Sequence, residues 1–352
     1  MAAIRPAGDF DTTYSKDMAV LRQAWHWVVT ILFLFFLFAL PTFASGYIVG
    51  IVITIGIWLI AVQGLGILTG YTGQISLGQA AFMAVGAYAS TLLVTRPGLS
   101  FWLALPSAGL IAGLVGLIFG LPSLRIKGFY LAMATLAAQF IIPWAIRVTA
   151  PEITGGVQGL EVPPPQLAGI TFSSHRMYPI VIAVVCLTTI AFKNLARTRT
   201  GRAFIAIRDN DLAAEVLGIN LFTYKLRAFF LSAFYAGLAG SLWAHYLSHV
   251  RPDEFGLDMS IWFLGMIIVG GMGSALGPIF GTIFVRLLKE FVIVLVPFLS
   301  STFPAFGGNL RAALTPMVFG LVLMLFLIFE PRGLAHRWDI LKAAWRLRPF
   351  SH

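Results

Sequence analysis

Charged side chains are scarce in this sequence, which holds 14 Asp and Glu and 24 Lys and Arg among 352 residues. They make up 11% of the chain, whereas soluble domains carry roughly 25%. Hydrophobic residues make up 59%, and the mean hydropathy is +0.88. This composition excludes an ordinary soluble domain and predicts a membrane protein. The net charge of +10 would suggest a nucleic-acid ligand in a soluble protein, but we expect none here.

Cysteine and catalytic motifs are nearly absent too. Cys186 is the only cysteine, which excludes an intramolecular disulfide and a thiolate metal cluster. No phosphate-binding loop GxxxxGK[ST] occurs, so an ATPase that drove this protein would be another chain. His245 and His249 have a spacing that suits a metal on one helix face, but interface histidines are commoner and the HExxH glutamate is missing. We expect no catalytic, cofactor-binding or metal site. No cluster of His, Cys, Asp or Glu in the sequence supports a membrane enzyme.

Long apolar runs are abundant, and each is close to the length that a helix needs to cross a bilayer. They are also too long for barrel strands, so the fold class is an all-α polytopic bundle. About ten transmembrane helices are predicted, near 25–43, 47–68, 80–95, 99–121, 129–149, 177–194, 227–248, 259–270, 277–299 and 312–330. The polar stretch before the first run is longer than the start of a signal peptide, so we expect that run to be retained.

The distribution of Lys and Arg predicts the orientation. Seventeen of them fall in the tail 1–24, the link 122–128, the loop 193–227 and the tail 331–352, against five in the alternate links. The positive-inside rule therefore places both tails and the 195–226 loop in the cytoplasm and leaves 25–330 as the transmembrane domain. The longest extracytoplasmic loop, 150–178, is rich in glycine and proline, which predicts an irregular, partly extended cover.

Two links are rich in glycine: GYTGQISLGQ at 70–79, the first glycine link, and GGMGSALGPIFG at 270–281, the second. Such glycines either allow close helix packing or mark backbone that leaves helical geometry beside a transport path. The run 259–270 would span only ~18 Å, so we expect the second link to lie inside the membrane. The candidate path-lining residues are Gln74, Ser76, Gln79, Gly271, Gly273 and Gly277.

Three ionisable residues, Arg286, Lys289 and Glu290, fall within an apolar run, where a functional role is the first hypothesis. Arg286 and Glu290 have the i, i+4 spacing of a helical ion pair. The alternative, which we favour, is that these side chains lie at the outer interface and extend their charges to water.

The interval from Arg197 to Gly240 is the longest strongly charged one. Asn210 or Asp211 suits the start of a short helix, and Gly218 suits its end. Leu212, Ala213, Val216 and Leu217 form an apolar stripe on it, and Phe204, Ile205 and Ile207 form another just before. This amphipathic helix could lie on lipid headgroups or dock into a protein groove, but Asp209, Asp211 and Glu215 disfavour anionic lipid.

Several of these stretches together resemble one family, the M-type permease subunit of branched-chain amino-acid ABC importers. They are GYTGQISLGQAAFMAVGAY, RTRTGRAFIAIRDNDLAAEVLGIN with YKLRAFFLSAFYAGLAG after it, IVGGMGSALGPIFG and EPRGL at 330–334. They cover most of the chain from about 50 to 334, in the family's order and spacing.

The resemblance implies a non-enzymatic permease of the bacterial inner membrane that pairs with a homologous second permease, two cytoplasmic ATPases that hold ATP and Mg, and an extracytoplasmic binding protein. It also implies that the short cytoplasmic helix is a coupling helix that docks on an ATPase. The residues that this implication covers are Gly201, Arg202, Ala203, Ile207, Arg208, Asp209, Asn210, Leu212, Glu215, Leu217 and Gly218.

The expected substrate is a branched-chain or related small amino acid. Permeases of the same family carry urea, short amides or small aromatic and dicarboxylic acids, which are the first alternative. A second alternative is a secondary transporter driven by ions, for which only Arg286, Lys289 and Glu290 could serve as intramembrane charges.

Overall fold

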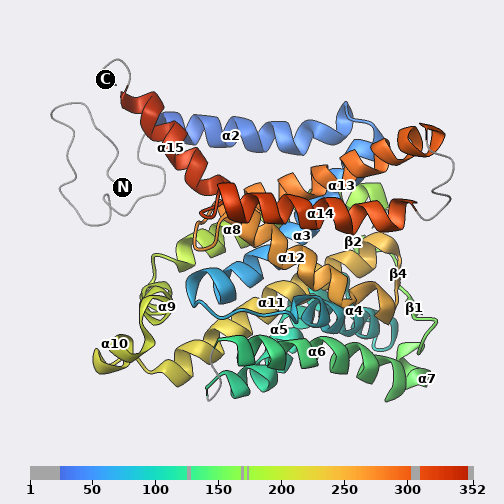
Figure 1. Cartoon of the computed structure of the whole chain (residues 1–352). Helices are drawn as coiled ribbons and strands as arrows, with labels where there is room; N and C mark the ends of the chain where they lie inside the picture. The colour runs from blue at the N-terminus through green and yellow to red at the C-terminus, as the bar shows by residue number, and fades with distance from the viewer. Residues whose placement is uncertain (1–23, 125–127, 168–169, 173, 303–309, 348–352) are drawn as a thin grey trace.

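The protein is a bundle of helices that run roughly along one common direction (Figure 1). A computed structural model describes residues 24–124, 128–167, 170–172, 174–302 and 310–347. The predicted tail 1–24 lies outside the described residues except for Ala24, as do Arg125 and Lys127. We call the two ends of the bundle the α9 end and the β4 end, after the elements that mark them in Figure 1.

Each of the ten predicted apolar runs falls on a helix of the structure. These helices are α2 (Ala24–Ala39), α3 (Gly46–Leu65), α4 (Gln79–Thr95), α5 (Phe101–Gly120), α6 (Phe129–Val148), α8 (Tyr178–Leu195), α11 (Leu221–Leu247), α12 (Leu257–Gly270), α13 (Gly277–Thr302) and α14 (Leu310–Phe329). A π-helical stretch, η2 (Gly66–Tyr71), prolongs α3. The other helices are α7 (Pro151–Thr154), α9 (Arg199–Asp209), α10 (Asp211–Val216) and α15 (Leu334–Leu347), with 3-10 turns η1 (Leu40–Thr42), η3 (Leu121–Leu124), η4 (Ser174–Met177) and η5 (Pro252–Phe255).

Among the described residues, five helices are long and apolar enough to cross a membrane alone. They are Gly46–Tyr71, Phe101–Gly120, Tyr130–Val148, Tyr178–Leu195 and Leu221–Leu247. A sixth span results if Leu314–Phe329 and Leu334–Ala344, which are bent by 47° at their break, count as one. The structure therefore has an all-α membrane architecture, and ten crossings remain a prediction.

The core lies around α3 and α11. In the most apolar stretch of each helix, 72% and 67% of the residues are buried in these two, against 33–39% in α5, α6 and α8. The helices α4, α5 and α11 approach one another through small residues. A Cβ added to Gly86 of α4 would lie 2.3 Å from the Cα of Gly237 in α11. Contact at this distance brings the two backbones together, which is how helices pack tightly where lipid gives no hydrophobic driving force.

Two helices begin inside the bundle, and their first turns meet there. After Tyr71 the first glycine link turns back, so that the Gln79 side chain donates a hydrogen bond to the Ala61 carbonyl at 2.8 Å. Ala61 lies ten residues before Tyr71, which puts the start of α4 ~15 Å inside the end of η2. From the opposite side, η5 carries the fully buried Phe255 inward before α12 begins. Ser260 of α12 then accepts a hydrogen bond from the Ala80 amide of α4 at 2.9 Å.

The second glycine link, by contrast, lies at the α9 end. A Cβ added to Gly70, in the last turn of η2, would be 2.9 Å from the Gly273 amide nitrogen. The segment Gly46–Tyr71 has 26 residues and a length of ~39 Å, longer than a hydrocarbon core. The second link lies beside the end of this long segment, and its depth in the membrane stays a prediction.

At the β4 end, the loop 150–178 contains short paired strands. Strand β1 (Leu160–Glu161) pairs antiparallel with β4 (His249–Val250), and β2 (Gln166–Leu167) pairs with β3 (Ile170–Thr171). Most of the remaining described part of this loop is irregular, as its glycines and prolines predict. The pairing of β1 with β4 ties this cover to the end of α11.

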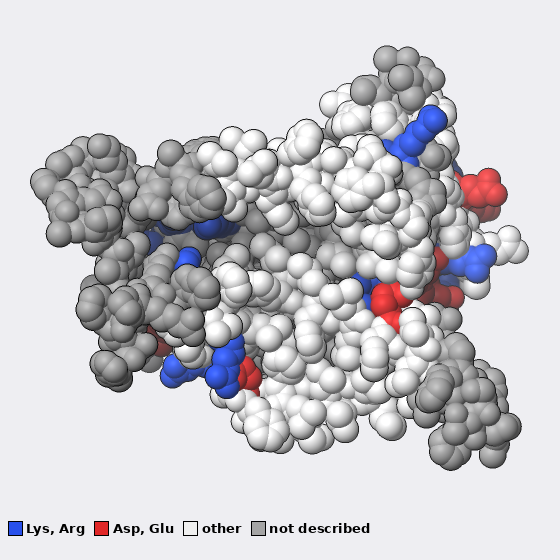
Figure 2. Space-filling view, turned by 90° about the horizontal axis from the view of Figure 1, so that it is seen from above, with Lys and Arg blue, Asp and Glu red and all other residues white. Residues whose placement is uncertain are grey.

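The surface carries the charge distribution of a membrane protein. Figure 2 shows one flank of the molecule, on which the Lys, Arg, Asp and Glu side chains gather toward the two ends and leave an uncharged band between them. A band of this kind can face hydrocarbon, where an exposed charge costs several kcal/mol.

Candidate functional site

The candidate site is built on α9, the helix that follows α8 at one end of the bundle. Thr198 begins the helix, and its side chain accepts a hydrogen bond from the Gly201 amide at 3.2 Å. The apolar face of α9 packs into the bundle, and Phe204 and Ile207 are buried. Of the predicted coupling residues, Gly201, Ala203 and Ile207 therefore contact this chain itself, whereas Arg202 is exposed.

The predicted short helix after it is present as α10. Asn210 accepts a hydrogen bond from the Ala213 amide at 3.1 Å, which confirms it as the first of the two alternative caps. At the other end Gly218 has φ +84°, and the Ile219 amide bonds to the Ala214 carbonyl at 3.0 Å. Gly218 thus ends the helix as its sequence position predicts.

The apolar stripe of α10 faces away from the bundle. Leu212, Val216 and Leu217 are 65%, 87% and 79% exposed, in contrast to the buried stripe of α9. We call Leu212, Ala213, Val216 and Leu217 the α10 knob. An ion pair at 3.7 Å between Asp211 and the buried Lys225 of α11 fixes α10 to the bundle. The two stripes, alike in sequence, therefore serve different contacts.

Arg208, in the last turn of α9, lies between the two glycine links. Its Nη1 donates to the Gly70 carbonyl at 3.2 Å, and its Nε and Nη2 donate to Asp209 at 3.1 and 2.9 Å. A Cβ added to Gly273 would lie 2.6 Å from Nη1, and one added to Gly73 would lie 3.0 Å from its Cγ. Arg208 is thus a direct connection from α9 to both links.

The segment 330–334 packs on the second glycine link from the other side. A Cβ added to Gly333 would lie 2.5 Å from the Cα and nitrogen of Gly271, and one added to Gly277 would lie 2.1 Å from the Gly271 carbonyl. Gly271 itself has φ +110°. Close backbone packing therefore accounts for Gly271, Gly273 and Gly277, and their place on a transport path stays a prediction. No pattern in the sequence predicts this contact.

A cavity of about 340 Å³ lies where α9 and α10 meet the first glycine link. Thr72, Gly73 and Gln74 line it from the link, Gly128 and Leu131 from the start of α6, and Ile207–Asp211 and Lys225 from the other side. The side-chain amide of Gln74 is 93% buried and has no hydrogen-bond partner among the described residues. Gln74 is therefore the predicted path residue that lines this cavity, and its side-chain polar atoms are buried and unpaired among the described residues.

The other two polar path candidates hold the backbone of the bundle. Gln79 donates to Ala61 and accepts a hydrogen bond from the Ser232 hydroxyl at 3.1 Å. Ser76 is fully buried, and its hydroxyl accepts from the Gly78 amide at 3.3 Å. In the described structure the side chains of Gln79 and Ser76 are both buried inside the bundle.

The histidine pair does not converge. His245 is buried, with its ring nitrogens 3.1 Å from the Ser90 hydroxyl and 3.0 Å from the Pro163 carbonyl. His249 instead lies 3.5 Å from Glu254. Burial raises the pKa of the Glu254 carboxyl above its ordinary value, and His249 opposes part of this effect. The described residues contain no group of three or more possible metal ligands of the His, Cys, Asp and Glu types.

The ionisable triad of α13 lies against tryptophans of α3 and α12. Arg286 and Glu290 form the predicted i, i+4 ion pair at 2.6 Å, with side chains 14% and 13% exposed. Tyr47 donates to Glu290 at 2.5 Å, and the Lys289 ammonium is 5.2 Å from the Trp58 ring. Tyr47 is the second residue of α3, at the β4 end, so this bond ties Glu290 to the end opposite the second glycine link, and the depth of the triad in the membrane stays a prediction.

Comparison with known proteins identifies the family. Residues 47–327 match the family described as the branched-chain amino acid transport system / permease component. The match includes both glycine links, α9 and α10, and it ends just before the 330–334 segment.

Individual relatives agree with this match. The high-affinity branched-chain amino acid transport system permease protein LivM of Escherichia coli is 34% identical over 259 residues, which cover 66% of this chain and 61% of the relative. The probable branched-chain amino acid transport permease protein LivM of Methanocaldococcus jannaschii is 24% identical, over 66% of this chain and 67% of the relative. The inner membrane ABC transporter permease protein YjfF of E. coli is 25% identical, over 69% and 70%. No solved structure has a significant match.

Proposed function

The chain belongs to the branched-chain amino acid transport system permease family, and on that basis we propose that it is the transmembrane permease subunit of an ABC importer. The matched region spans about three fifths of the E. coli relative, so activity, substrate and partners are proposed here for the whole protein. The proposed cargo is a branched-chain or related small amino acid.

The observation that carries this proposal is the α10 knob. An apolar surface that is 65–87% exposed at its three large residues, fixed to the bundle by Asp211 and Lys225, suits insertion into a groove of another protein. The chain has no phosphate loop, so ATP and Mg would bind to that partner. A pair of ATPases on the cytoplasmic side is the partner that this arrangement fits.

Arg208 supports a route for the coupling. When a partner moves the knob, α10 moves the end of α9, and Arg208 transmits this movement to Gly70 and the second glycine link. These links hold the starts and ends of α3, α4, α12 and α13, so a small displacement there would shift the bundle between its inward-open and outward-open states.

The remaining assembly follows from the same proposal. The α9 end faces the cytoplasm of a bacterium, and both tails lie on that side of the inner membrane. A homologous second permease completes the path, and an extracytoplasmic binding protein delivers substrate to the β4 end. Gln74, which lines the cavity beside α9, contributes to the inner part of the path.

A second candidate is an ion-coupled transporter, and the Arg286–Glu290 pair is the observation that favours it. Uptake of radiolabelled leucine into host cells separates the two. The importer predicts uptake that requires this gene, falls on ATP depletion and survives a protonophore, whereas ion coupling predicts the reverse sensitivities. Competition by valine, isoleucine, urea and glutamate then ranks the substrate classes.

The docking of α10 on an ATPase is tested with protein purified from the same cells. Val216→Asp places a charge in the knob without touching the bundle, so the purified chain should keep its thermal stability and lose at least tenfold of the co-purifying ATPase. Equal recovery of ATPase with the variant would refute the docking role of α10.

A further inference from the structure

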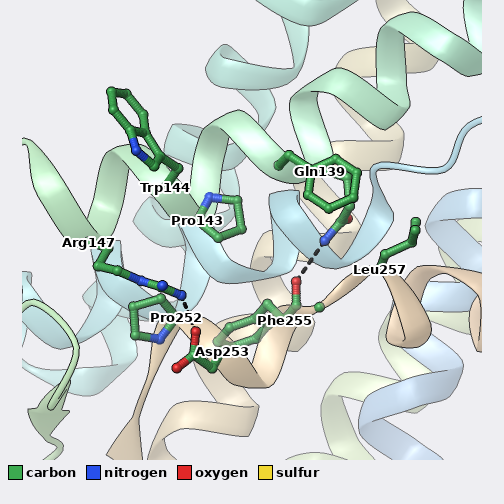
Figure 3. A pocket seen from close by; sticks show the side chains of 10 residues that line it. Gln139, Pro143, Trp144, Arg147, Pro252, Asp253, Phe255 and Leu257 are labelled. Atoms are coloured by element: carbon green, nitrogen blue, oxygen red, sulfur yellow. Dashed lines mark hydrogen bonds and ion pairs between the residues drawn. The ribbon is translucent and has the colours of Figure 1, made fainter.

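A second cavity, of about 290 Å³, lies on the opposite half of the bundle between α6 and the η5–α12 junction. Its lining residues are Gln139, Phe140, Pro143, Trp144, Arg147, Pro252, Asp253, Phe255, Gly256 and Leu257. The volume is at the small end of ligand pockets, which suits a molecule smaller than a nucleotide or a peptide. We call this cavity the α6 pocket (Figure 3).

One end of the α6 pocket carries two opposite charges. Arg147 of α6 and Asp253 of η5 form an ion pair there, with side chains 39% and 59% exposed (Figure 3). The Nε of Arg147 is buried and has no hydrogen-bond partner among the described residues. The buried Nε is out of reach of a ligand, but parts of both side chains remain open to solvent, so each charge can bind a further group.

The rest of the lining is mostly apolar. Phe140, Pro143, Trp144, Pro252 and Phe255 supply aromatic and proline surface next to the charges. Figure 3 shows Gln139 and Phe255 joined at the far end from Arg147, and the bond from Gln139 Nε2 to the Phe255 carbonyl measures 2.7 Å. Gln139 also accepts from Ser260 at 2.8 Å and from the Ala81 amide at 3.1 Å. These hydrogen bonds hold Gln139 in place at the floor of the pocket. A ligand would therefore bind through the two charges and not through Gln139.

The start of α12 carries a negative charge of its own. α12 begins with Leu257 at the pocket wall, and the Asp258 carboxylate of its first turn lies beside Gly256, with Oδ1 2.5 Å from the position of an added Cβ. This carboxylate already uses the favourable charge of the helix start, so Arg147 is the group that attracts a ligand anion.

We propose that the α6 pocket is an outer binding subsite for a zwitterionic α-amino acid with an apolar side chain. The carboxylate binds at Arg147, the ammonium binds at Asp253, and the side chain packs on the aromatic and proline surface. Asp253 would repel a ligand that carried only a negative charge. A sugar would find too few hydrogen-bond donors in the pocket. This proposal rests on the proposed importer function and names a place where that importer holds its substrate.

The test uses the complete importer, purified from its host and reconstituted in liposomes with its binding protein. Irradiation with a diazirine analogue of leucine during turnover should label peptides of α6 and η5, and excess leucine should suppress the label. 4-Methylpentanoate and isopentylamine, which each lack one charge of leucine, should suppress it at least tenfold less well because each loses a charge-assisted hydrogen bond.

A charge exchange separates a binding role of the pair from a structural one. Arg147→Asp with Asp253→Arg restores an ion pair, so a structural role predicts normal folding and normal uptake. The subsite predicts normal folding with the KM for leucine raised about tenfold or more, since both charges of the ligand now meet like charges. Arg96→Gln, at an exposed arginine of the same end that does not line the pocket, is the matched control and should leave uptake unchanged.

The outcomes are distinguishable. Absence of ATP-driven uptake in the unmodified complex would refute the importer itself. Normal uptake with labelling confined to other helices, or full activity of the charge-exchanged variant, would overturn the subsite and leave the importer standing.

Discussion

The Nη1 of Arg208 donates a hydrogen bond to the carbonyl oxygen of Gly70 at 3.2 Å, across 138 positions of sequence. This bond joins the last turn of α9 to the end of η2, and the same guanidinium binds Asp209 through Nε and Nη2. A planar fork is needed to make these bonds together, and lysine does not offer one.

Arg208→Lys should therefore uncouple ATP hydrolysis from transport. We expect leucine uptake per ATP hydrolysed to fall about tenfold, because the charge stays but the fork is lost. The measurement compares uptake and ATPase rates in reconstituted complexes of equal subunit content. Arg199→Lys, at an exposed arginine of the same helix, should behave as wild type, and an unchanged ratio for Arg208→Lys would rule out this connection.

Gly333→Ala should destabilise the contact between the 330–334 segment and the second glycine link. Its φ is +75° and its new Cβ would lie 2.5 Å from the Gly271 backbone, so we expect a loss of about 2–4 kcal/mol. Gly320→Ala in α14 is the control, because a Cβ there has nothing within 4 Å. Melting in detergent should fall for the first variant and stay constant or rise for the second; equal melting would contradict the contact.

Glu290→Gln should weaken the triad of α13 by leaving Arg286 without its 2.6 Å partner in a largely buried place. We expect a cost of about 3 kcal/mol, of which Arg286→Met combined with Glu290→Leu recovers most. A double-mutant cycle of thermal melting on Arg286→Met, Glu290→Leu and their combination measures this coupling. If the stability losses of the two single variants add up to the loss of the double variant, the pair makes no energetic contribution.

The half-buried Glu254 should make stability depend on pH at the β4 end. Because its pKa is raised in the folded protein, the protonated form is favoured there, and this stability is lost as the pH rises through the folded pKa. The melting temperature should therefore decrease from just below the ordinary glutamate pKa to above it, and Glu254→Gln should flatten that decrease. Identical pH profiles for both proteins would exclude Glu254 as the cause.

The local elements were predictable from the sequence, and their depth was not. Ten apolar runs and the cap at Asn210 follow from composition and short-range hydrogen bonding, which depend on neighbouring residues only. The short run before Gly270 does not reveal at which end its length is missing. The inward course of η5, fixed by the buried Phe255, decides that.

The candidate site shows the same limit. Arg208 has the sequence context of an exposed loop cation, and its bond to Gly70 depends on a fold that brings distant segments together. The ion pair of Arg147 with Asp253 could not be predicted from the sequence either, since 106 positions separate the two residues. The exposed stripe of α10 and the buried stripe of α9 differ only in what the bundle places against them.

The α10 knob has one further consequence for the living cell. A copy of this subunit that has not yet found its ATPase holds Leu212, Val216 and Leu217 in water, which is the feature that chaperones and proteases bind on unassembled proteins. We expect surplus copies to be degraded until docking hides the three side chains. Subunit stoichiometry would then be set after synthesis, by the lifetime of orphan copies.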